Sequence, residues 1–595
     1  MSRQGPRPAR LLAAGAAAVL VFASCGDTTV SPTASTSRGP EGTAGSTLVP
    51  SAPPSRGPFE PMAYPADGPA PCEQPSSDDP AIGPYEGAIR RIHAKDAATV
   101  IFELCDSDPA FLAKVASPAL TIDDTAWLQS RIDPAADRQR ILTEVNGTGP
   151  FRVDHWDGSG DIALARYDDY WGPRASVDAL IFVSDSDAGR RLSKLREGSV
   201  DGIDRVAPGD VESVRANPEL TLAHRRGLNT VYIGLNNRFA PFDNEAVRQA
   251  ISVGIDRTVI VDATFPPDTD LATHFLPCAV QFGCAGAAWT PADPALGRDI
   301  LADAGFPDGF ATTITYSAEA RDYLPDPTAT ATAVQAQLRD QLGIEATLNV
   351  LPFDELIKAV DGGRLSGLYL LGTRARVPDP SNLLEGHFGP DASLQFGRRF
   401  DDIARALAQG RSSANPKVRL QGYSRVNDRI RAHVPMVPLA HVGSAGAFRT
   451  DVTGATVTAT SSERFTSVVP GDRTQFVFMQ DARPAGLYCP DETIESALRV
   501  CAQVAEGLYR FDLPEPTLTP ALAEACAPDK RQMTWTCSLR QNVRFHDGAR
   551  LDANDVVLSF AVQWDAANPL HRGRTATFQA FLDRFGGFLN PPATQ

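Results

Sequence analysis

The chain has 595 residues, 43% of them hydrophobic and 22% charged, so it is long enough to form two or three lobes with sizeable cores. Its formal net charge of −16 argues against nucleic acid as a partner, because a nucleic-acid-binding protein presents a basic face. This charge fits a protein that works in water beside an anionic surface without adhering to it.

The first 25 residues have the composition of a targeting segment. Three arginines within the first ten residues precede an apolar stretch, residues 11–23, that is too short to span a bilayer stably. Residues 22–26 resemble a bacterial lipobox with Cys25 as the lipidated residue, although Phe22 stands where leucine is usual. We therefore expect an exported protein anchored through lipid on Cys25. Plain secretion with cleavage nearby is the alternative.

The next segment, residues 26–84, is rich in Pro, Ser, Thr and Gly and has almost no periodic apolar pattern. A segment of this composition cannot bury enough apolar surface to fold by itself. We expect it to be a disordered tether that holds the folded part of the chain away from a membrane.

The cysteines predict disulfides. Besides Cys25 the chain has eight cysteines, and an even number in an exported protein is typical of disulfide pairing. Their spacing suggests three local pairs, Cys278 with Cys284, Cys489 with Cys501, and Cys526 with Cys537, which leaves Cys72 to pair with Cys105. A metal site is the rival interpretation, but the zinc-type Cys and His spacings are missing from the sequence. We expect no metal and no cofactor.

The first folded elements are expected after residue 84. Residues 99–104 have the pattern of a strand, and residues 109–115 fit a short helix. A glycine-rich stretch, residues 146–151, opens a strand that a hairpin turn joins to residues 161–167. This stretch is a weak candidate for a phosphate loop, because it leads into a strand and lacks a following Lys-Ser/Thr.

Residues 291–440 have the alternating pattern of an α/β lobe. Helices are predicted over 294–304 and up to Gly343, an alternating strand over 344–350, and a buried strand over 365–371. Strand, helix and strand in this order imply a right-handed crossover. Because open parallel sheets bind ligands beyond the carboxyl ends of their strands, the following loop, residues 372–383, should border a crevice.

Residues 544–560 predict a strand end, a tight turn and a capped helix. Asp547-Gly548 supplies the turn, and Asp552 or Asn554 can cap the helix. The neighbouring His546 and Asp547 could suggest a catalytic pair, but the turn chemistry accounts for the aspartate. The sequence also lacks the HExxH, GxSxG and SxxK motifs of common exported enzymes, so we expect no enzyme.

Several of these stretches resemble landmarks of one family, the family 5 extracellular solute-binding proteins (dipeptide, oligopeptide and nickel type) of ABC importers. The resemblance is carried by residues 146–151, residues 167–172, the helix start at 241–251, the loop with Asp379, Pro380 and Asn382, the run Glu506-Gly507-Leu508, and residues 544–560. It implies an α/β, two-lobed fold of the periplasmic-binding-protein type II class with an extra subdomain.

The order of the landmarks differs from that of the family. The stretch that resembles residues 544–560 normally lies near the beginning of the mature chain, and here it lies near the end. Cutting the chain near residue 460 and joining residue 590 to residue 85 restores the family order. We therefore interpret the chain as a circular permutant, which is physically reasonable where chain ends lie close together at a surface. Two fused partial copies are the rival interpretation, but no family segment occurs twice.

The family order also predicts the domains. The extra subdomain should comprise residues 85–145 and 511–590, lobe I residues 146–235 and 442–510, and lobe II residues 236–441. Hinges between the lobes are expected near residues 232–236 and 436–441.

The loop after the buried strand supplies most of the candidate ligand contacts. They are Thr373, Arg374, Arg376, Asp379 and Asn382, and Tyr488 is a further candidate. In peptide-binding members of the family an aspartate at the Arg376 position holds the ligand's ammonium group, and a tryptophan stands at the Thr373 position. A cationic side chain there would repel an ammonium group and favour a carboxylate or a phosphate. The alternative is that Arg374 and Arg376 are solvated and paired with nearby acids.

The resemblance implies capture of a peptide or other small solute by hinge closure and delivery to an ABC permease that a separate ATPase powers. It implies a monomer outside the cytoplasm, held at the membrane by its lipid anchor. A ligand-binding sensor module without transport is the alternative function, and an exported hydrolase is a more remote one.

Overall fold

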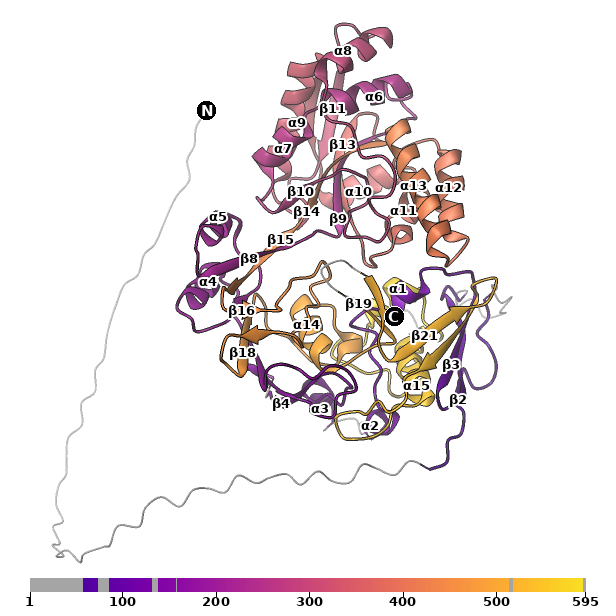
Figure 1. Ribbon diagram of the computed structural model, residues 1–595. Coiled ribbons are helices and arrows are strands. Elements are labelled where there is room, and N and C mark those ends of the chain that lie inside the picture. The colour runs from indigo at the N-terminus through magenta and orange to yellow at the C-terminus, as the bar shows by residue number, and fades with distance from the viewer. Residues whose placement is uncertain (1–56, 73–84, 131–136, 157, 513–516, 592–595) are drawn as a thin grey trace, which may run out of the picture. The chain divides into compact units, whose positions relative to one another are not determined.

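Three β-sheets organise the computed structural model, which describes residues 57–72, 85–130, 137–156, 158–512 and 517–591 (Figure 1). The sheets have five, six and seven strands. The predicted targeting segment, Cys25 and most of the predicted tether lie outside the described residues.

The five-stranded sheet joins strands from both ends of the sequence, with β2 and β3 beside strands near the yellow end of the chain in Figure 1. Neighbouring strands are antiparallel, in the order β1 (Ala63–Tyr64), β2 (Ile89–Asp96), β3 (Thr99–Leu104), β22 (Thr534–Leu539) and β21 (Ala523–Pro528). The neighbouring elements are α1 (Phe111–Val115), α2 (Thr125–Gln129), α15 (Ala553–Trp564), α16 (Gln579–Phe585) and the hairpin of β19 (Tyr509–Asp512) and β20 (Thr517–Pro520). Phe102 packs against Phe111 and Phe560, with ring centroids 5.1 and 5.0 Å away, so both ends of the sequence share one core.

The seven-stranded sheet is also built from two distant parts of the sequence. Its order is β4 (Phe151–His155), β5 (Ile162–Arg166), β6 (Ala179–Ser184), β18 (Gln475–Gln480), β7 (Gly202–Ile203), β15 (Ser444–Arg449) and β8 (Leu220–Arg225). The predicted hairpin of β4 and β5 is confirmed, and β18 pairs in parallel with β6. The accompanying elements are α3 (Asp137–Thr143), α4 (Ala188–Arg196), α5 (Val211–Arg215), α14 (Glu495–Val504), the 3-10 turns Pro208–Asp210 and Cys489–Asp491, and the pair β16 (Val452–Thr453) and β17 (Val469–Pro470).

The six-stranded sheet carries the predicted α/β pattern. Its order is β10 (Thr269–Leu271), β14 (Met436–Val442), β9 (Asn229–Leu235), β13 (Leu368–Arg374), β11 (Ala311–Tyr316) and β12 (Glu345–Val350), and β11 is parallel to both β12 and β13. Its helices are α6 (Glu245–Gly254), α7 (Arg257–Thr264), α8 (Pro294–Asp303), α9 (Pro327–Leu342), α10 (Phe353–Asp361), α11 (Pro380–Phe388), α12 (Asp401–Arg411) and α13 (Pro416–His433). As predicted, α9 ends where Gly343 takes the left-handed conformation, with φ of 66°.

The turn and helix predicted over residues 544–560 have the expected chemistry. Gly548 has φ of 90°, and its N–H donates to the carbonyl of Phe545. The Asp552 side chain accepts from the N–H of Asn554, and the Asp555 side chain accepts from the N–H of Asp552, at 2.9 and 2.8 Å. This reciprocal capping fixes the start of α15.

The predicted tether is wrong for residues 57–72. There β1 pairs with β2, Ala70 is buried, and the Tyr64 ring lies 6.1 Å from the Trp564 ring. Two-residue strands among prolines give no periodic pattern, which is why the sequence did not reveal this contact. Near the end of the chain, Phe578 and Gly586 flank α16 with positive φ values of 40° and 74°, which limits this helix to Gln579–Phe585.

All four predicted disulfides are confirmed. The pairs are Cys72 with Cys105, Cys278 with Cys284, Cys489 with Cys501, and Cys526 with Cys537. The last pair joins directly opposed positions of β21 and β22.

Glu506 connects several stretches that carry the family resemblance. Its carboxylate accepts hydrogen bonds from Tyr170 Oη at 2.8 Å, Trp171 Nε1 at 2.7 Å and Thr148 Oγ1 at 3.2 Å. Glu506 is buried, so these bonds compensate for the loss of water around its charge. Those landmarks are therefore parts of one structural contact rather than of a ligand site.

Candidate ligand-binding site

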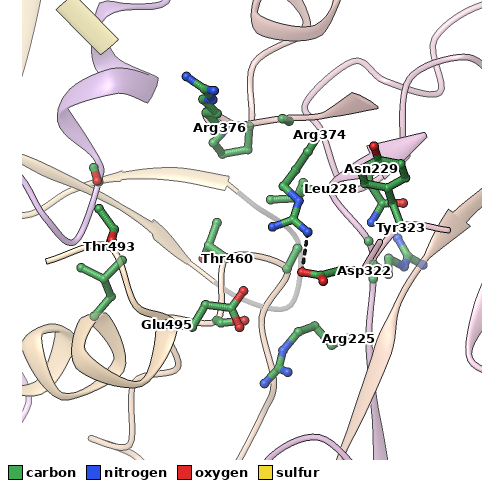
Figure 2. A pocket seen from close by; sticks show the side chains of 18 of the residues that line it. Arg225, Leu228, Asn229, Asp322, Tyr323, Arg374, Arg376, Thr460, Thr493 and Glu495 are labelled. Carbon is green, nitrogen blue, oxygen red and sulfur yellow. Dashed lines mark hydrogen bonds and ion pairs between the residues drawn. The ribbon is translucent and has the colours of Figure 1, made fainter. Parts of the chain in front are cut away.

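A cavity of about 830 Å³ is lined by residues from distant parts of the chain (Figure 2). Most of them lie in residues 372–378 around the end of β13, residues 225–229 and 442–444 beside β9 and β14, residues 459–461, the beginning of α14 and the body of α16. The others are Ala113, Ser117, Pro118, Ala119, Arg205, Asp322, Tyr323 and Phe511. A concave site of several hundred cubic ångströms with convergent polar groups is typical of small-molecule binding.

The predicted loop reaches this cavity through Thr373, Arg374 and Arg376. Both arginines are paired with acids: Arg374 Nη2 lies 2.7 Å from Asp322 Oδ2, and Arg376 Nη1 lies 2.6 Å from Asp583 Oδ1. Figure 2 shows the first of these pairs. Arg374 and Arg376 therefore line the cavity, as expected, and are also paired with nearby acids, which was the alternative interpretation.

Asp379 and Asn382 do not line the cavity but shape the loop that does. Asp379 is buried, accepts from the N–H of Ser381 at the start of α11, and pairs with Arg419. Asn382 Oδ1 accepts from the N–H of Arg376 at 2.8 Å. These two side chains therefore position Arg376.

Tyr488 lies in the core and outside the cavity lining. It is 3% exposed, and its ring centroid lies 6.2 Å from that of Phe578. Burial raises the pKa of its hydroxyl well above the ordinary value. The structure therefore gives Tyr488 no contact with the cavity.

Sequence reasoning missed most charged residues of the lining, among them Asp322, Asp583 and Arg584. The Arg584 guanidinium donates to the carbonyls of Ala580 at 2.8 Å and Arg376 at 3.2 Å, and within the described part of the chain its Nε has no hydrogen-bond partner. Burial lowers the pKa of Arg584 to about 10. Nothing in the sequence near residue 584 signals this role, because Arg376 lies about two hundred positions earlier.

Two short connections join the six-stranded to the seven-stranded sheet beside the cavity: residues 226–228 between β8 and β9, and Gly443 between β14 and β15. A Cβ atom on Gly227 would meet the Val442 carbonyl oxygen at 2.3 Å, and one on Gly443 would meet the Arg225 carbonyl oxygen at 2.5 Å. The Asn229 side chain bonds both the N–H and the carbonyl of Val442, each at 2.8 Å. The connections therefore run in direct contact, and only glycine fits at these two positions.

The residues at which we expected hinges lie inside a sheet. Residues 232–236 and 436–441 fall largely within β9 and β14, which pair with each other inside the six-stranded sheet. The chain passes from the seven-stranded to the six-stranded sheet before Asn229, and not after residue 235 where we expected the lobe boundary. The apolar pattern of β9 fits either sheet, so the sequence could not place this boundary.

A buried ionic cluster holds the first connection in place. Arg225 lines the cavity and lies 2.7 Å from both Asp204 and Glu463, and Arg499 lies 2.7 and 2.6 Å from the same two carboxylates. Burial alone would raise the pKa of Asp204, but Arg499 and Arg225 hold it below the ordinary value. The charge of the Arg225 guanidinium is therefore compensated within the wall.

His546 and Asp547 do not form a catalytic pair. The His546 ring lies 4.9 Å from the Tyr167 ring, and its Nε2 is 3.1 Å from the Gly149 carbonyl oxygen. Burial lowers the pKa of His546 to about 4. Asp547 accepts from the N–H of Ala549 within the turn, as the turn chemistry predicts.

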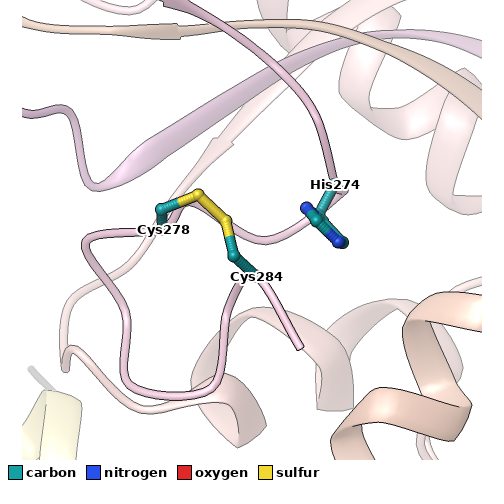
Figure 3. A group of neighbouring side chains, drawn as sticks. All are labelled: His274, Cys278 and Cys284. Carbon is teal, nitrogen blue, oxygen red and sulfur yellow. A yellow bond between two sulfur atoms is a disulfide. The ribbon is translucent and has the colours of Figure 1, made fainter. Parts of the chain in front are cut away.

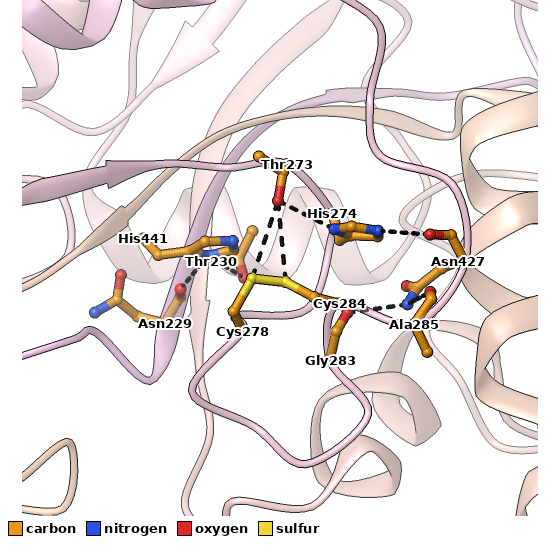
Figure 4. Close-up of a disulfide and its surroundings, with 11 residues drawn as sticks. Asn229, Thr230, Thr273, His274, Cys278, Gly283, Cys284, Ala285, Asn427 and His441 are labelled. Carbon is orange, nitrogen blue, oxygen red and sulfur yellow. Dashed lines mark hydrogen bonds between the residues drawn. A yellow bond between two sulfur atoms is a disulfide. The ribbon is translucent and has the colours of Figure 1, made fainter. Parts of the chain in front are cut away.

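His274, Cys278 and Cys284 lie together, with donor atoms within 4.8 Å of one another (Figure 3). The two sulfurs form a disulfide, so neither has a thiolate to offer a metal. Thr273 Oγ1 lies 4.0 and 3.9 Å from the sulfurs and 3.1 Å from His274 Nδ1 (Figure 4). In this form the group is a structural disulfide with a polar neighbour.

None of the helices in the described part of the chain is both long and apolar enough to cross a bilayer.

Comparison with known proteins connects the fold and the site to one family. The sequence model of the bacterial extracellular solute-binding proteins, family 5 Middle, matches residues 53–395 and 517–583, which is more than half of the chain. The match is divided into two segments, which residues 396–516 separate.

Among curated proteins, the chain is similar to Di/tripeptide-binding protein 1 of Pseudomonas aeruginosa (strain UCBPP-PA14), with 28% identity over 368 residues, 59% of this chain and 66% of that protein. It is also similar to Heme-binding protein A of Haemophilus influenzae, with 25% identity over 359 residues, 59% of this chain and 64% of that protein. The chain therefore spans slightly less than two thirds of the length of these relatives.

Among solved structures, the chain is similar to HbpA2 from Haemophilus parasuis, with a TM-score of 0.60 and 25% identity over 64% of this chain and 76% of that chain. The fold is the type II fold of periplasmic binding proteins. The family consists of solute-binding proteins and not of enzymes. The chain belongs to the bacterial extracellular solute-binding proteins of family 5.

Proposed function

We propose that the chain captures a peptide or another small solute in the cavity described above. The observation that carries this proposal is the cavity of about 830 Å³ beside the two connections, because a solute there contacts residues from both connected sheets and from α16. Relatives are named for di/tripeptides and for heme, so the ligand class differs within the family.

Closure about the two connections retains the solute. Residues 226–228 and Gly443 are short segments in which small changes of φ and ψ move one sheet relative to the other. A solute that contacts both sides binds the closed arrangement more tightly than the open one, and so shifts the population toward closure.

The captured solute is delivered to an ABC permease, and a lipid on Cys25 keeps the monomeric protein at the outer side of the membrane. The family name and the lipobox-like sequence support this part of the proposal. Membrane fractionation of the wild type and of Cys25→Ser tests the anchor. A Cys25→Ser variant that stays in the membrane fraction contradicts it.

Native mass spectrometry of protein purified without denaturation tests solute capture. We expect an excess mass that disappears after unfolding and refolding. Small-angle scattering should then give a smaller radius of gyration for the loaded than for the unloaded protein. The proposal fails if there is no excess mass and the radius of gyration stays unchanged in a mixture of peptides and other small solutes.

A further inference from the structure

The charge of the cavity lining is opposite to that of the chain as a whole. The chain has 72 acidic residues against 56 lysines and arginines. The lining has six arginines (Arg205, Arg225, Arg226, Arg374, Arg376, Arg584) against four acids (Asp322, Glu492, Glu495, Asp583). A cavity of reversed sign concentrates ions of the opposite charge, so this lining favours anionic solutes.

The acids of the lining are already neutralised by arginines. Asp322 is paired with Arg374 and Asp583 with Arg376, as described above. Glu495 lies 2.6 Å from Arg205, and Glu492 lies 3.1 Å from Arg574. A cationic solute would have to displace an arginine to reach any of these four carboxylates.

In the part of the chain that the structure describes, Arg584 lacks the carboxylate partner that Arg205, Arg225, Arg374 and Arg376 each have. Its hydrogen bonds go to two backbone carbonyls, and among the described residues no carboxylate lies within ion-pair distance of it. It also lies against Arg376, whose carbonyl it bonds. Burial of this guanidinium without a paired carboxylate leaves positive charge that an anion can compensate.

We propose that the solute carries an acidic group, a carboxylate or a phosphate, which binds between the guanidinium groups of Arg376 and Arg584 and displaces Asp583 from Arg376. The proposal rests on solute capture in this cavity. The Arg376 side chain is 64% exposed and therefore free to rotate toward a solute. When Asp583 leaves, it keeps the hydrogen bond from Gln579 Nε2 at 2.8 Å, so its carboxylate is not left without a donor.

The exchange assigns Asp583 a definite role. Its carboxylate occupies Arg376 in the structure and competes with the solute for the same donor atoms. The loop that carries Arg376 stays fixed, because Asn382 holds the backbone N–H of Arg376 and of Val377. The acidic group of the solute and the Asp583 carboxylate therefore bind the Arg376 guanidinium in turn, while the loop stays in place.

The experiment uses matched pairs of probes in titration calorimetry with the full chain. The carboxylate arm compares succinate with succinamide and N-acetyl-Ala-Ala with its C-terminal amide, and the phosphate arm compares glucose 6-phosphate with glucose. We expect at least one acid to bind tenfold or more tightly than its neutral counterpart, which corresponds to about 1.4 kcal/mol. The arm that responds identifies the acidic group. Equal affinity within every pair, or no binding of any acid, overturns the proposal.

Variants locate the contact. Arg376→Gln and Arg584→Gln should each weaken the preferred acid about tenfold or more, while Arg339→Gln on the exposed face of α9 should not change its affinity. Asp583→Asn should strengthen the acid severalfold, because it removes the competing carboxylate. Weaker acid binding in Asp583→Asn, or unchanged binding in Arg376→Gln, overturns the proposal even if Arg584→Gln fails to fold.

The outcomes also separate this inference from solute capture itself. A protein that binds the neutral probes, closes around them and ignores the arginine substitutions contradicts the acidic ligand but leaves capture intact. A protein that binds none of the probes, carries no excess mass and never closes contradicts both.

Discussion

Asp123 is a buried carboxyl whose surroundings disfavour its charge. It is 5% exposed, and its Oδ2 has no hydrogen-bond partner among the residues that the structure describes. Burial, together with the nearby Asp124 and Asp555 carboxylates, raises the pKa of Asp123 to about 7. Since the unfolded chain releases this proton near the ordinary value of 3.8, the stability that it supports is complete below that pH and is lost as the pH rises toward 7.

We therefore predict that Asp123→Asn stabilises the protein at pH 8, by roughly 1–3 kcal/mol, because the amide never has to ionise in the core. The gain should become smaller as the pH falls to 5. Thermal unfolding at both pH values measures it, with Asp303→Asn on the surface of α8 as the control. Equal or lower stability of Asp123→Asn at pH 8 would contradict the pKa shift.

At this scale the sequence identified side chains whose neighbours are local. Arg374 and Arg376 were found because a loop that follows a buried strand borders a crevice. Asp583 and Arg584 were missed because they reach Arg376 through the tertiary fold, across about two hundred positions of sequence. Tyr488 was misplaced for the same reason, since its burial beside Phe578 depends on a segment far along the chain.

At the scale of elements, the two connections between sheets depend on glycine. A Cβ on Gly443 would lie 2.5 and 2.6 Å from the carbonyl oxygens of Arg225 and Asp268, and both obstacles are backbone atoms that cannot rotate away. The Asn229 side chain then ties Val442, the residue before Gly443, to the other connection. A change at Gly443 is thus transmitted to both connections.

We predict that Gly443→Ala costs about 1–3 kcal/mol of stability and reduces closure, because the connections must separate to admit the methyl group. Chemical denaturation measures the first effect and small-angle scattering with ligand the second. Gly386→Ala on the exposed face of α11, where a Cβ meets nothing within 4 Å, is the matched control and should be neutral or stabilising. Normal stability and closure of Gly443→Ala would show that the glycine is not required.

Elements with strong local signals were predictable, and their partners in the sheets were not. The capping residues Asp552 and Gly343 and the hairpin of β4 and β5 were read correctly from local chemistry. The strands that pair with β9 could not be predicted. Each of its seven residues is buried, and the sequence of a fully buried strand does not indicate which sheet it joins.

At the scale of the whole molecule, we propose that the chain is circularly permuted and that its three sheets mark lobe I, lobe II and the extra subdomain. The N–H of Ala88 donates to the carbonyl of Phe585 at 2.6 Å, so the two segments that the family order would join are adjacent. Trp564 contacts both of them, donating to Tyr85 Oη at 2.8 Å and accepting from the N–H of Leu589 at 2.9 Å. The strand β18, which follows the proposed cut, pairs with β6 in the sheet that also holds β4.

The proposal predicts that a rearranged chain folds to the same structure. This chain would begin at Asp472, run to residue 591, continue through a flexible glycine-serine linker to residue 57, and end at Gly471. Residues 471–474 are exposed, and each of the four disulfides closes a loop that neither the cut nor the linker interrupts. Because lengthening a surface connection costs little, we expect the free energy of unfolding to change by no more than roughly 2 kcal/mol.

Chemical denaturation and disulfide mapping test the rearranged chain, and calorimetry with a solute that binds the natural chain tests its site. A second rearrangement supplies the control, with its cut inside β14, whose residues are all buried and paired with β9; it should not fold. If neither rearranged chain folds, the two ends near Trp564 cannot be joined by a linker, and the permuted order is contradicted. If only the chain cut before Asp472 folds and binds, then residues 585–589 and 85–88 act as one connection, as the family order requires.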